Sequence, residues 1–86
     1  MLSAIVLIKA RPNRIAALGL ELANVEGVTE VYSVTGEEDF VVIVRVGKHA
    51  DLEAVIGRDI NGIEGVEDTR TLIAFRSYSR DDLEML

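Results

Sequence analysis

The feature that most constrains the fold is an internal repeat. Glu26-Gly27-Val28 recurs as Glu64-Gly65-Val66, 38 positions further along the chain. At the same spacing Ala16 matches Ala54, Gly19 matches Gly57, Asn13 matches Asp51, and Ile5-Val6 falls on Ile43-Val44. Each half reads as strand, helix, strand. The repeat therefore predicts a duplicated β-α-β unit within 86 residues, a length that fits one domain only.

Apolar spacing predicts the elements of the first half. Residues 2–9 form a β-branched run typical of a strand, and Asn13 is a favourable N-cap for a helix over residues 14–24. The inward face of that helix carries Ile15, Leu18 and Leu22. Gly27 ends the unit, and a second strand follows it. In that strand Val28, Tyr32 and Val34 fall on one side and Val31 on the other.

The second half repeats this pattern after a polar turn at Gly36–Asp39, which predicts an antiparallel hairpin into an apolar strand from Phe40 to Val46. Asp51 is expected to cap a second helix, and residues 66–76 to form a fourth strand. The inward residues of the second helix are Leu52, Val55, Ile56 and Ile60. Ser79-Arg80-Asp81-Asp82 has the form of a capping box, which predicts a short helix through Leu86. We therefore expect a domain over residues 1–78 and a helix or tail over 79–86.

The order βαββαβ predicts an α+β fold, a ferredoxin-like sandwich with two helices on one face of a four-stranded antiparallel sheet. A strand with one solvent-exposed face should alternate apolar and polar residues, but residues 4–8 and 40–44 are continuously apolar. Both faces of these strands are therefore expected to be buried. A second copy of the sheet is the simplest cover, so we expect a homodimer through the sheet face. The alternative is that the C-terminal segment folds back over it.

Charge and composition exclude several classes of function. Nine Lys and Arg residues against 15 Asp and Glu give a net charge of −6, which repels phosphate backbones and argues against direct nucleic-acid binding. The chain has no Cys, so it has no disulfide and no thiolate metal site. Its apolar start is short and has no preceding basic residues, so it predicts neither a signal peptide nor a membrane span. We expect a soluble, cytoplasmic protein.

Residues suited to catalysis are few. His49 is the only histidine and lies in a polar stretch, where a solvated side chain is the simpler interpretation. Glu37-Glu38-Asp39 could bind a hard cation, although adjacent acids on a turn are usually a solvated tip. Gly-rich phosphate-binding patterns do not occur in the sequence. We therefore expect no enzyme activity and no cofactor.

Two polar groups of residues remain as candidates for ligand binding. Gly36 can take a positive φ at the hairpin tip, and Asp39 at the start of the third strand can accept N–H groups. Thr69 and Thr71 are two residues apart in a strand, so both hydroxyls point to one face. These pairs suit a small polar ligand. Asp39 could equally be a turn cap, and the two threonines could be ordinary strand-forming residues. The pattern alone favours this simpler interpretation.

From Glu26 to Phe75 the sequence resembles the effector-binding RAM domain of the Lrp/AsnC regulators. Residues 27–39 are similar to that family's hairpin motif, in which Gly-Val leads to Val-Thr-Gly and an Asp. Residues 65–71 are similar to its Gly-Val-x-x-Thr-x-Thr strand entry. Glu38 departs from the pattern, because the family usually has an aromatic residue before the Asp. The family's N-terminal helix-turn-helix is also missing ahead of Met1, so we expect a stand-alone effector domain.

The resemblance implies a function. In that family sheets pair face to face in dimers, dimers assemble into rings of four, and a small effector, commonly an amino acid, binds between dimers. It implies effector-binding roles for Gly36, Asp39, Thr69 and Thr71. Asp39 would meet an α-ammonium group, and the threonine hydroxyls with backbone N–H groups would bind a carboxylate. Such a module would modulate transcription by self-assembly or by association with full-length Lrp/AsnC regulators.

Two alternatives share this topology. A small dimeric α/β-barrel enzyme would need an inward cluster of His, Tyr or Trp, whereas this chain has one His and no Trp. An ACT-like regulatory domain would share the fold and the ligand class, but the Thr-x-Thr strand entry is less expected there.

Overall fold

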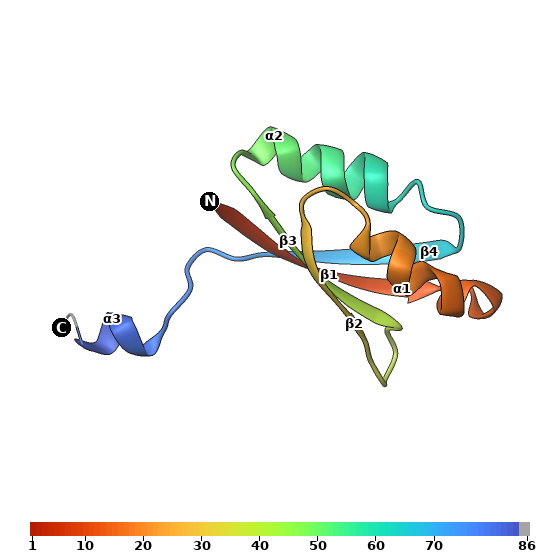
Figure 1. Ribbon diagram of the computed structural model, residues 1–86, viewed down its shortest axis with the longest axis horizontal. Coiled ribbons are helices and arrows are strands. Elements are labelled where there is room, and N and C mark those ends of the chain that lie inside the picture. Colours follow the sequence, from red (N-terminus) through yellow and green to blue (C-terminus); the bar gives the residue numbers. More distant parts are fainter. Residues whose placement is uncertain (85–86) are drawn as a thin grey trace.

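The computed structural model describes residues 1–84, and the elements follow the predicted order (Figure 1). The strands are β1 (Leu2–Ala10), β2 (Val28–Ser33), β3 (Phe40–Val46) and β4 (Val66–Ile73). The helices are the 3₁₀ turn η1 (Pro12–Arg14), α1 (Ile15–Ala23), α2 (His49–Leu52), its π-helical continuation η2 (Glu53–Ile60), and α3 (Arg80–Glu84).

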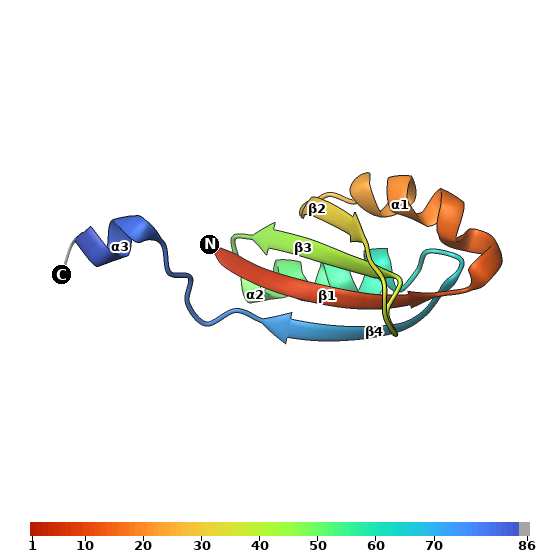
Figure 2. The same cartoon turned by 90° about the horizontal axis from the view of Figure 1, so that it is seen from below.

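The four strands form one antiparallel sheet in the order β2-β3-β1-β4. The two helical segments, α1 and α2 with η2, lie on the same face of this sheet (Figures 1 and 2). Both the strand order and the one-sided helical layer confirm the ferredoxin-like βαββαβ fold predicted from the sequence.

The core lies between the helices and the face of the sheet that they cover, called the covered face below. Strand residues Ala4, Val6, Ile8, Phe40, Val42 and Val44 are 0–3% exposed. From the helices, Leu18, Leu22, Leu52, Val55 and Ile60 are buried against them, and Ile15 and Ile56 are half-buried. The inward positions predicted for both helices are therefore confirmed.

The two edge strands carry a β-bulge at the same place in the repeat. Val28 pairs with Val44 and Glu30 with Ile43, which leaves Thr29 as the extra residue of β2. In β4, Ala10 pairs with Val66 and Lys9 with Asp68, which leaves Glu67 as the extra residue 38 positions later. Because Val66 and Val28 are equivalent, their partners Ala10 and Val44 are equivalent too. Each residue of β1 therefore corresponds to the residue of β3 that lies 34 positions later, not 38. The sequence match of Ile5-Val6 with Ile43-Val44 was thus wrong as a structural equivalence.

The bulge also corrects the predicted faces of the second strand. A bulge advances the chain by one residue without a partner, so the side chains on its two sides fall out of alternation. Val28 lies on the covered face opposite Val44, together with Val31 opposite Val42. Tyr32, opposite Val41, lies on the other face. Grouping Val28 with Tyr32 was therefore wrong.

The predicted helix caps were partly correct at one helix of three. The N-cap positions are Arg14 for α1 and Lys48 for α2, with no side-chain capping bond at either, so the Asn13 and Asp51 caps were wrong. Instead, the Asn13 side chain accepts a bond from Arg11 Nε at 2.9 Å. One half of the capping box before α3 is confirmed, because the Ser79 N–H donates to the Asp82 carboxylate at 2.7 Å. The Ser79 hydroxyl donates to the same carboxylate, and the Asp82 N–H donates to the Ser79 carbonyl instead of the hydroxyl. The predicted continuation of this helix to Leu86 lies partly outside the described residues.

The opposite side of the sheet, called the uncovered face below, has no helix over it (Figure 2). Its centre consists of Ile5 opposite Ile43 and Leu7 opposite Val41, all four half-buried. Leu72 and Tyr32 at its margins are 51% and 50% exposed. Residues 74–84, called the C-terminal arm, run away from the body of the domain in both views (Figures 1 and 2). The arm does not fold back over this face, as the alternative interpretation required.

Candidate functional site

The hairpin tip between β2 and β3 (residues 34–39) owes its shape to a glycine and a backbone bond. The Val34 N–H donates to the Asp39 carbonyl at 3.1 Å and closes the loop. Gly36 has a φ of +110°, a conformation that disfavours residues with a side chain. No heavy atom lies within 4 Å of where a Cβ would stand, so only the backbone conformation requires glycine there.

Asp39 fastens this tip to the end of β1. Its backbone N–H donates to the Ile8 carbonyl at 2.8 Å, and its carboxylate Oδ2 accepts the Ala10 N–H at 2.7 Å. The side chain is half-buried. One carboxylate oxygen therefore has a structural role, whereas Oδ1 has no hydrogen-bond partner within residues 1–84.

The two threonines lie on the covered face at its β4 edge. Thr69 pairs with Ile8 and Thr71 with Val6, both of which point toward the helices. Paired residues of neighbouring strands share a face, so the two hydroxyls lie on one side as predicted. Thr69 Oγ1 lies 3.1 Å from Asn61 Oδ1, just beyond η2, and Thr71 is exposed.

The hairpin tip reaches β4 within one chain, but on the face opposite to the threonines. β2 and β4 are opposite edges, which predicts that the two groups can meet only between subunits. However, Phe40, Ile8 and Thr69 form one row, so β1 alone separates the start of β3 from Thr69. Figure 2 shows the tip crossing β1 toward β4. Glu38 Oε1 there lies 3.6 Å from the Arg70 guanidinium. Arg70 pairs with Leu7 and lies on the uncovered face, so this contact does not bring the tip to the two threonines, which are on the covered face.

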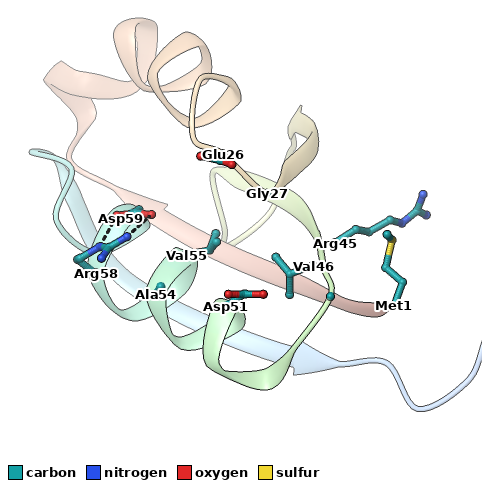
Figure 3. A pocket seen from close by; sticks show the side chains of 11 residues that line it. Met1, Glu26, Gly27, Arg45, Val46, Asp51, Ala54, Val55, Arg58 and Asp59 are labelled. Atoms are coloured by element: carbon teal, nitrogen blue, oxygen red, sulfur yellow. Dashed lines mark hydrogen bonds and ion pairs between the residues drawn. The ribbon is translucent and has the colours of Figure 1, made fainter.

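The described residues also form a hollow of about 540 Å³ at the opposite end of the sheet (Figure 3). It lies between η2, the Gly27 turn and the end of β3. Its charged lining residues are Glu26, Arg45, Asp51, Arg58 and Asp59. Arg58 Nε donates to Asp59 at 2.8 Å, and this bond holds the pKa of Asp59 below its ordinary value. None of the four predicted effector residues lines this hollow.

The repeat is the sequence signal that points to this hollow. Its counterpart in the other half, about 380 Å³, is lined by Arg14, Glu21 and Glu64. There the Arg14 guanidinium donates to the Glu64 carbonyl at 3.1 Å and pairs with Glu21, so the charges are satisfied internally. Because Glu26-Gly27 repeats as Glu64-Gly65, the motif marks both hollows, although sequence reasoning used it only to define the duplication.

The other candidate groups lie on the surface. His49 is exposed in the first turn of α2, and Glu37 is exposed at the hairpin tip. Across residues 1–84, no group of three or more His, Cys, Asp or Glu side chains is arranged to hold a metal ion. Among the helices that the structure describes, none combines the length and apolarity needed to cross a membrane.

A family model described as the Lrp/AsnC ligand binding domain matches residues 3–83. The chain belongs to this family. The match confirms the resemblance drawn from the hairpin and Thr-x-Thr motifs. Because Lrp/AsnC domains of this kind are regulatory ligand-binding domains and not enzymes, it also confirms that the chain is not an enzyme, and the α/β-barrel alternative is set aside.

Relatives place the chain within the family more closely. An uncharacterized HTH-type transcriptional regulator of Pyrococcus furiosus is 34% identical over 80 residues, which are 93% of this chain and 53% of that protein. The HTH-type transcriptional regulator FL11 of Pyrococcus abyssi is 33% identical over 75 residues, 87% of this chain and 49% of the relative. This Lrp/AsnC domain thus spans about half the length of the curated relatives that it matches.

Solved structures agree with this assignment. A protein of Thermus thermophilus is 49% identical, with a TM-score of 0.88 over 93% of this chain and all of that chain. A feast or famine regulatory protein of M. tuberculosis, complexed with L-methionine, is 34% identical with a TM-score of 0.78. That match covers 94% of this chain and 54% of the M. tuberculosis chain.

Proposed function

We propose that this Lrp/AsnC domain binds a small amino-acid effector and couples that binding to self-association through its uncovered face. The observation that carries the proposal is the apolar uncovered face, on a domain of a ligand-binding family. The structure of the 34% identical M. tuberculosis protein is of a complex with L-methionine, which supports an amino acid as the class of effector. Self-assembly, or association with full-length Lrp/AsnC regulators, would then transmit the signal to transcription.

Self-association rests on the side chains of the uncovered face. Ile5, Leu7, Val41 and Ile43 form an apolar patch across the two central strands. Burying an aliphatic side chain fully stabilises an assembly by about 1.5–3 kcal/mol relative to leaving it in water. A second copy presents the same patch, so a two-fold homodimer buries both at once. Further assembly into a ring of four dimers belongs to the same proposal.

The effector site is proposed at the hairpin-tip end, around Gly36, Asp39, Thr69 and Thr71. Asp39 Oδ1 is available to accept an effector ammonium while Oδ2 holds the Ala10 N–H. The exposed Thr71 hydroxyl can donate to an effector carboxylate, whereas Thr69 first exchanges its contact with Asn61. β1 still separates the two halves of the site, so a neighbouring subunit is expected to complete it. An effector that binds across subunits stabilises the assembly that it spans.

A thermal-shift screen against the twenty amino acids, followed by calorimetry with the best one, tests this site. Asp39→Asn keeps an oxygen that can accept the Ala10 N–H but removes the negative charge, so the fold should survive. We expect it to weaken effector binding roughly ten- to hundredfold, the loss of one charge-assisted hydrogen bond. Glu53→Gln, which removes an exposed carboxylate on η2, on the side of the sheet away from the uncovered face, is the matched control. Equal affinity of Asp39→Asn and wild type would reject the site.

Several expectations from the sequence remain predictions. The chain carries a net charge of −6, so we expect no binding to duplex DNA at physiological salt; a salt-sensitive gel shift would contradict this. The division into residues 1–78 and 79–86 and the cytoplasmic location also remain predictions. Membership of the Lrp/AsnC family sets the ACT-like alternative aside as well.

A further inference from the structure

We propose that the C-terminal arm clasps a second copy of this chain beside the uncovered face. The inference rests on the proposed self-association, because it concerns how the two copies hold each other. It adds a second contact region, on residues that the sheet-to-sheet pairing does not use.

The arm is detached from the body of its own chain. Its last bond to the sheet is the Ala74 N–H, which donates to the Ser3 carbonyl at 2.9 Å. Beyond it, Phe75 is 103% exposed, Tyr78 76% and Leu83 70%. The radius of gyration is 14.0 Å, whereas a compact chain of this length is expected near ~12 Å. Three large apolar side chains on a projecting segment indicate a contact with something outside the chain.

The arm nevertheless has a defined shape. The capping box fixes the start of α3, and the Arg76 guanidinium lies 5.1 Å from the centre of the Tyr78 ring. Together with Leu83 these residues line a hollow of about 470 Å³. A five-residue helix lies far below the ~12–15 residues that an isolated helix needs in water. Packing from outside is therefore required to keep α3 folded.

The size of the uncovered face points to a second copy as the occupant. A stable interface buries about 800 Å² on each partner. The four central side chains of the uncovered face are already half-buried in the single chain, so covering them removes only part of their surface from water. The exposed Phe75, Tyr78 and Leu83 supply additional apolar surface for the same interface.

Continuity with the uncovered face supports the same occupant. The arm leaves from β4, whose Leu72 lies at the margin of that face opposite Ile5. When two sheets pair about a two-fold axis, a contact made by one arm is repeated by the other. The match to the family extends through residue 83, so the arm belongs to the domain pattern.

The double variant Phe75→Ser, Leu83→Ser in the full chain tests the arm. We expect its dimer dissociation constant, measured by sedimentation equilibrium, to rise at least about 30-fold, because each copy loses two buried apolar side chains. Leu20→Ser is the matched control: Leu20 is 81% exposed on α1, away from the uncovered face, and its loss should leave the constant unchanged. An unchanged constant in the double variant overturns the arm contact and leaves the sheet pairing intact. A monomeric wild-type chain would reject the sheet pairing and the arm together.

A mixed-label NMR experiment distinguishes a clasp from a fold-back. Wild-type chains labelled with ¹³C and ¹⁵N are mixed with unlabelled chains, and filtered spectra select contacts between copies. We expect contacts from the Phe75 ring to the other copy. Contacts only within one copy would mean that the arm covers its own sheet, and no contacts would mean that it is free. Either result overturns the proposal.

Discussion

The covered and uncovered faces of the sheet carry nearly the same side chains but have different surroundings. Along β1, Val6 and Ile8 are fully buried beneath the helices, while their neighbours Ile5 and Leu7 stay half-buried on the other side. The side chains of the covered face are buried within one chain, so they determine the stability of the fold. The side chains of the uncovered face remain partly exposed in one chain, so they are expected to determine association. The apolar sequence pattern alone predicts that both faces are buried, but it does not identify what buries each of them.

The largest test of this comparison uses two isoleucines of the same strand. Ile8→Ala should lower the free energy of unfolding by about 2–5 kcal/mol, because it leaves a cavity in the covered core. This loss should be the same at every protein concentration in urea denaturation. Ile5→Ala is the matched variant on the uncovered face, and its effect should shrink as the protein is diluted below its dimer dissociation constant. Equal, concentration-independent losses in both variants would remove the distinction between the faces.

A charge on the uncovered face should separate folding from association. Leu7→Glu places a carboxylate from each copy in the apolar interface, where an unpaired charge is costly. We expect roughly a 100-fold rise in the dimer dissociation constant, about 2.7 kcal/mol, with an unchanged far-ultraviolet circular dichroism spectrum. Light scattering provides the measurement. A variant that stays dimeric at micromolar concentration would place the interface elsewhere.

Two glycines sharpen the comparison between the packed body and the solvated tip. Both have a positive φ, +97° at Gly27 and +110° at Gly36. An added Cβ at Gly27 would stand 2.9 Å from Val55 Cγ2, whereas at Gly36 it meets nothing within 4 Å. Gly36→Ala should therefore cost only the backbone strain of about 1–3 kcal/mol, and Gly27→Ala about 1–2 kcal/mol more from overpacking. Thermal denaturation of the two variants measures the difference, and equal losses would contradict it.

The smallest expected effect concerns the pair that ties the tip to β4. Arg70 and Glu38 lie 3.6 Å apart with side chains 68% and 25% exposed. Exposed pairs of this kind contribute about 0.2–1 kcal/mol, less at high salt. A double-mutant cycle with Arg70→Ala and Glu38→Ala should give a coupling in that range. A coupling unaffected by about 1 M salt would show that the contact is not electrostatic.

Much of the fold was predictable from the sequence because its signals are local and repeated. Continuous apolar runs identified the central strands, and helical spacing identified inward residues such as Leu18 and Ile60. The errors in the predicted strand faces and helix caps came from features that the hydrophobic pattern of a sequence does not encode. A single extra residue at Thr29 reverses the facing of Val28, and a preceding 3₁₀ turn moves the start of α1 beyond Asn13.

The candidate site was less predictable, because it depends on how the hairpin tip bends. The sequence singled out Asp39 but could not show that one of its oxygens holds the Ala10 N–H. Strand order alone separated the tip from β4, whereas the contact between Glu38 and Arg70 is tertiary. The hollow beside Arg58 was missed, since its lining comes from separate segments that meet only when the chain folds.

The matched bulges at Thr29 and Glu67 have a consequence for aggregation. β2 and β4 are the two ends of the sheet, where unpaired backbone groups could recruit further strands and build amyloid-like stacks. A bulge twists each end and interrupts its ladder, and Glu30, Asp68 and Arg70 add charge nearby. A chain with such apolar central strands is thereby prevented from growing sideways without limit. Association through the uncovered face, as proposed above, would instead give an assembly of fixed size.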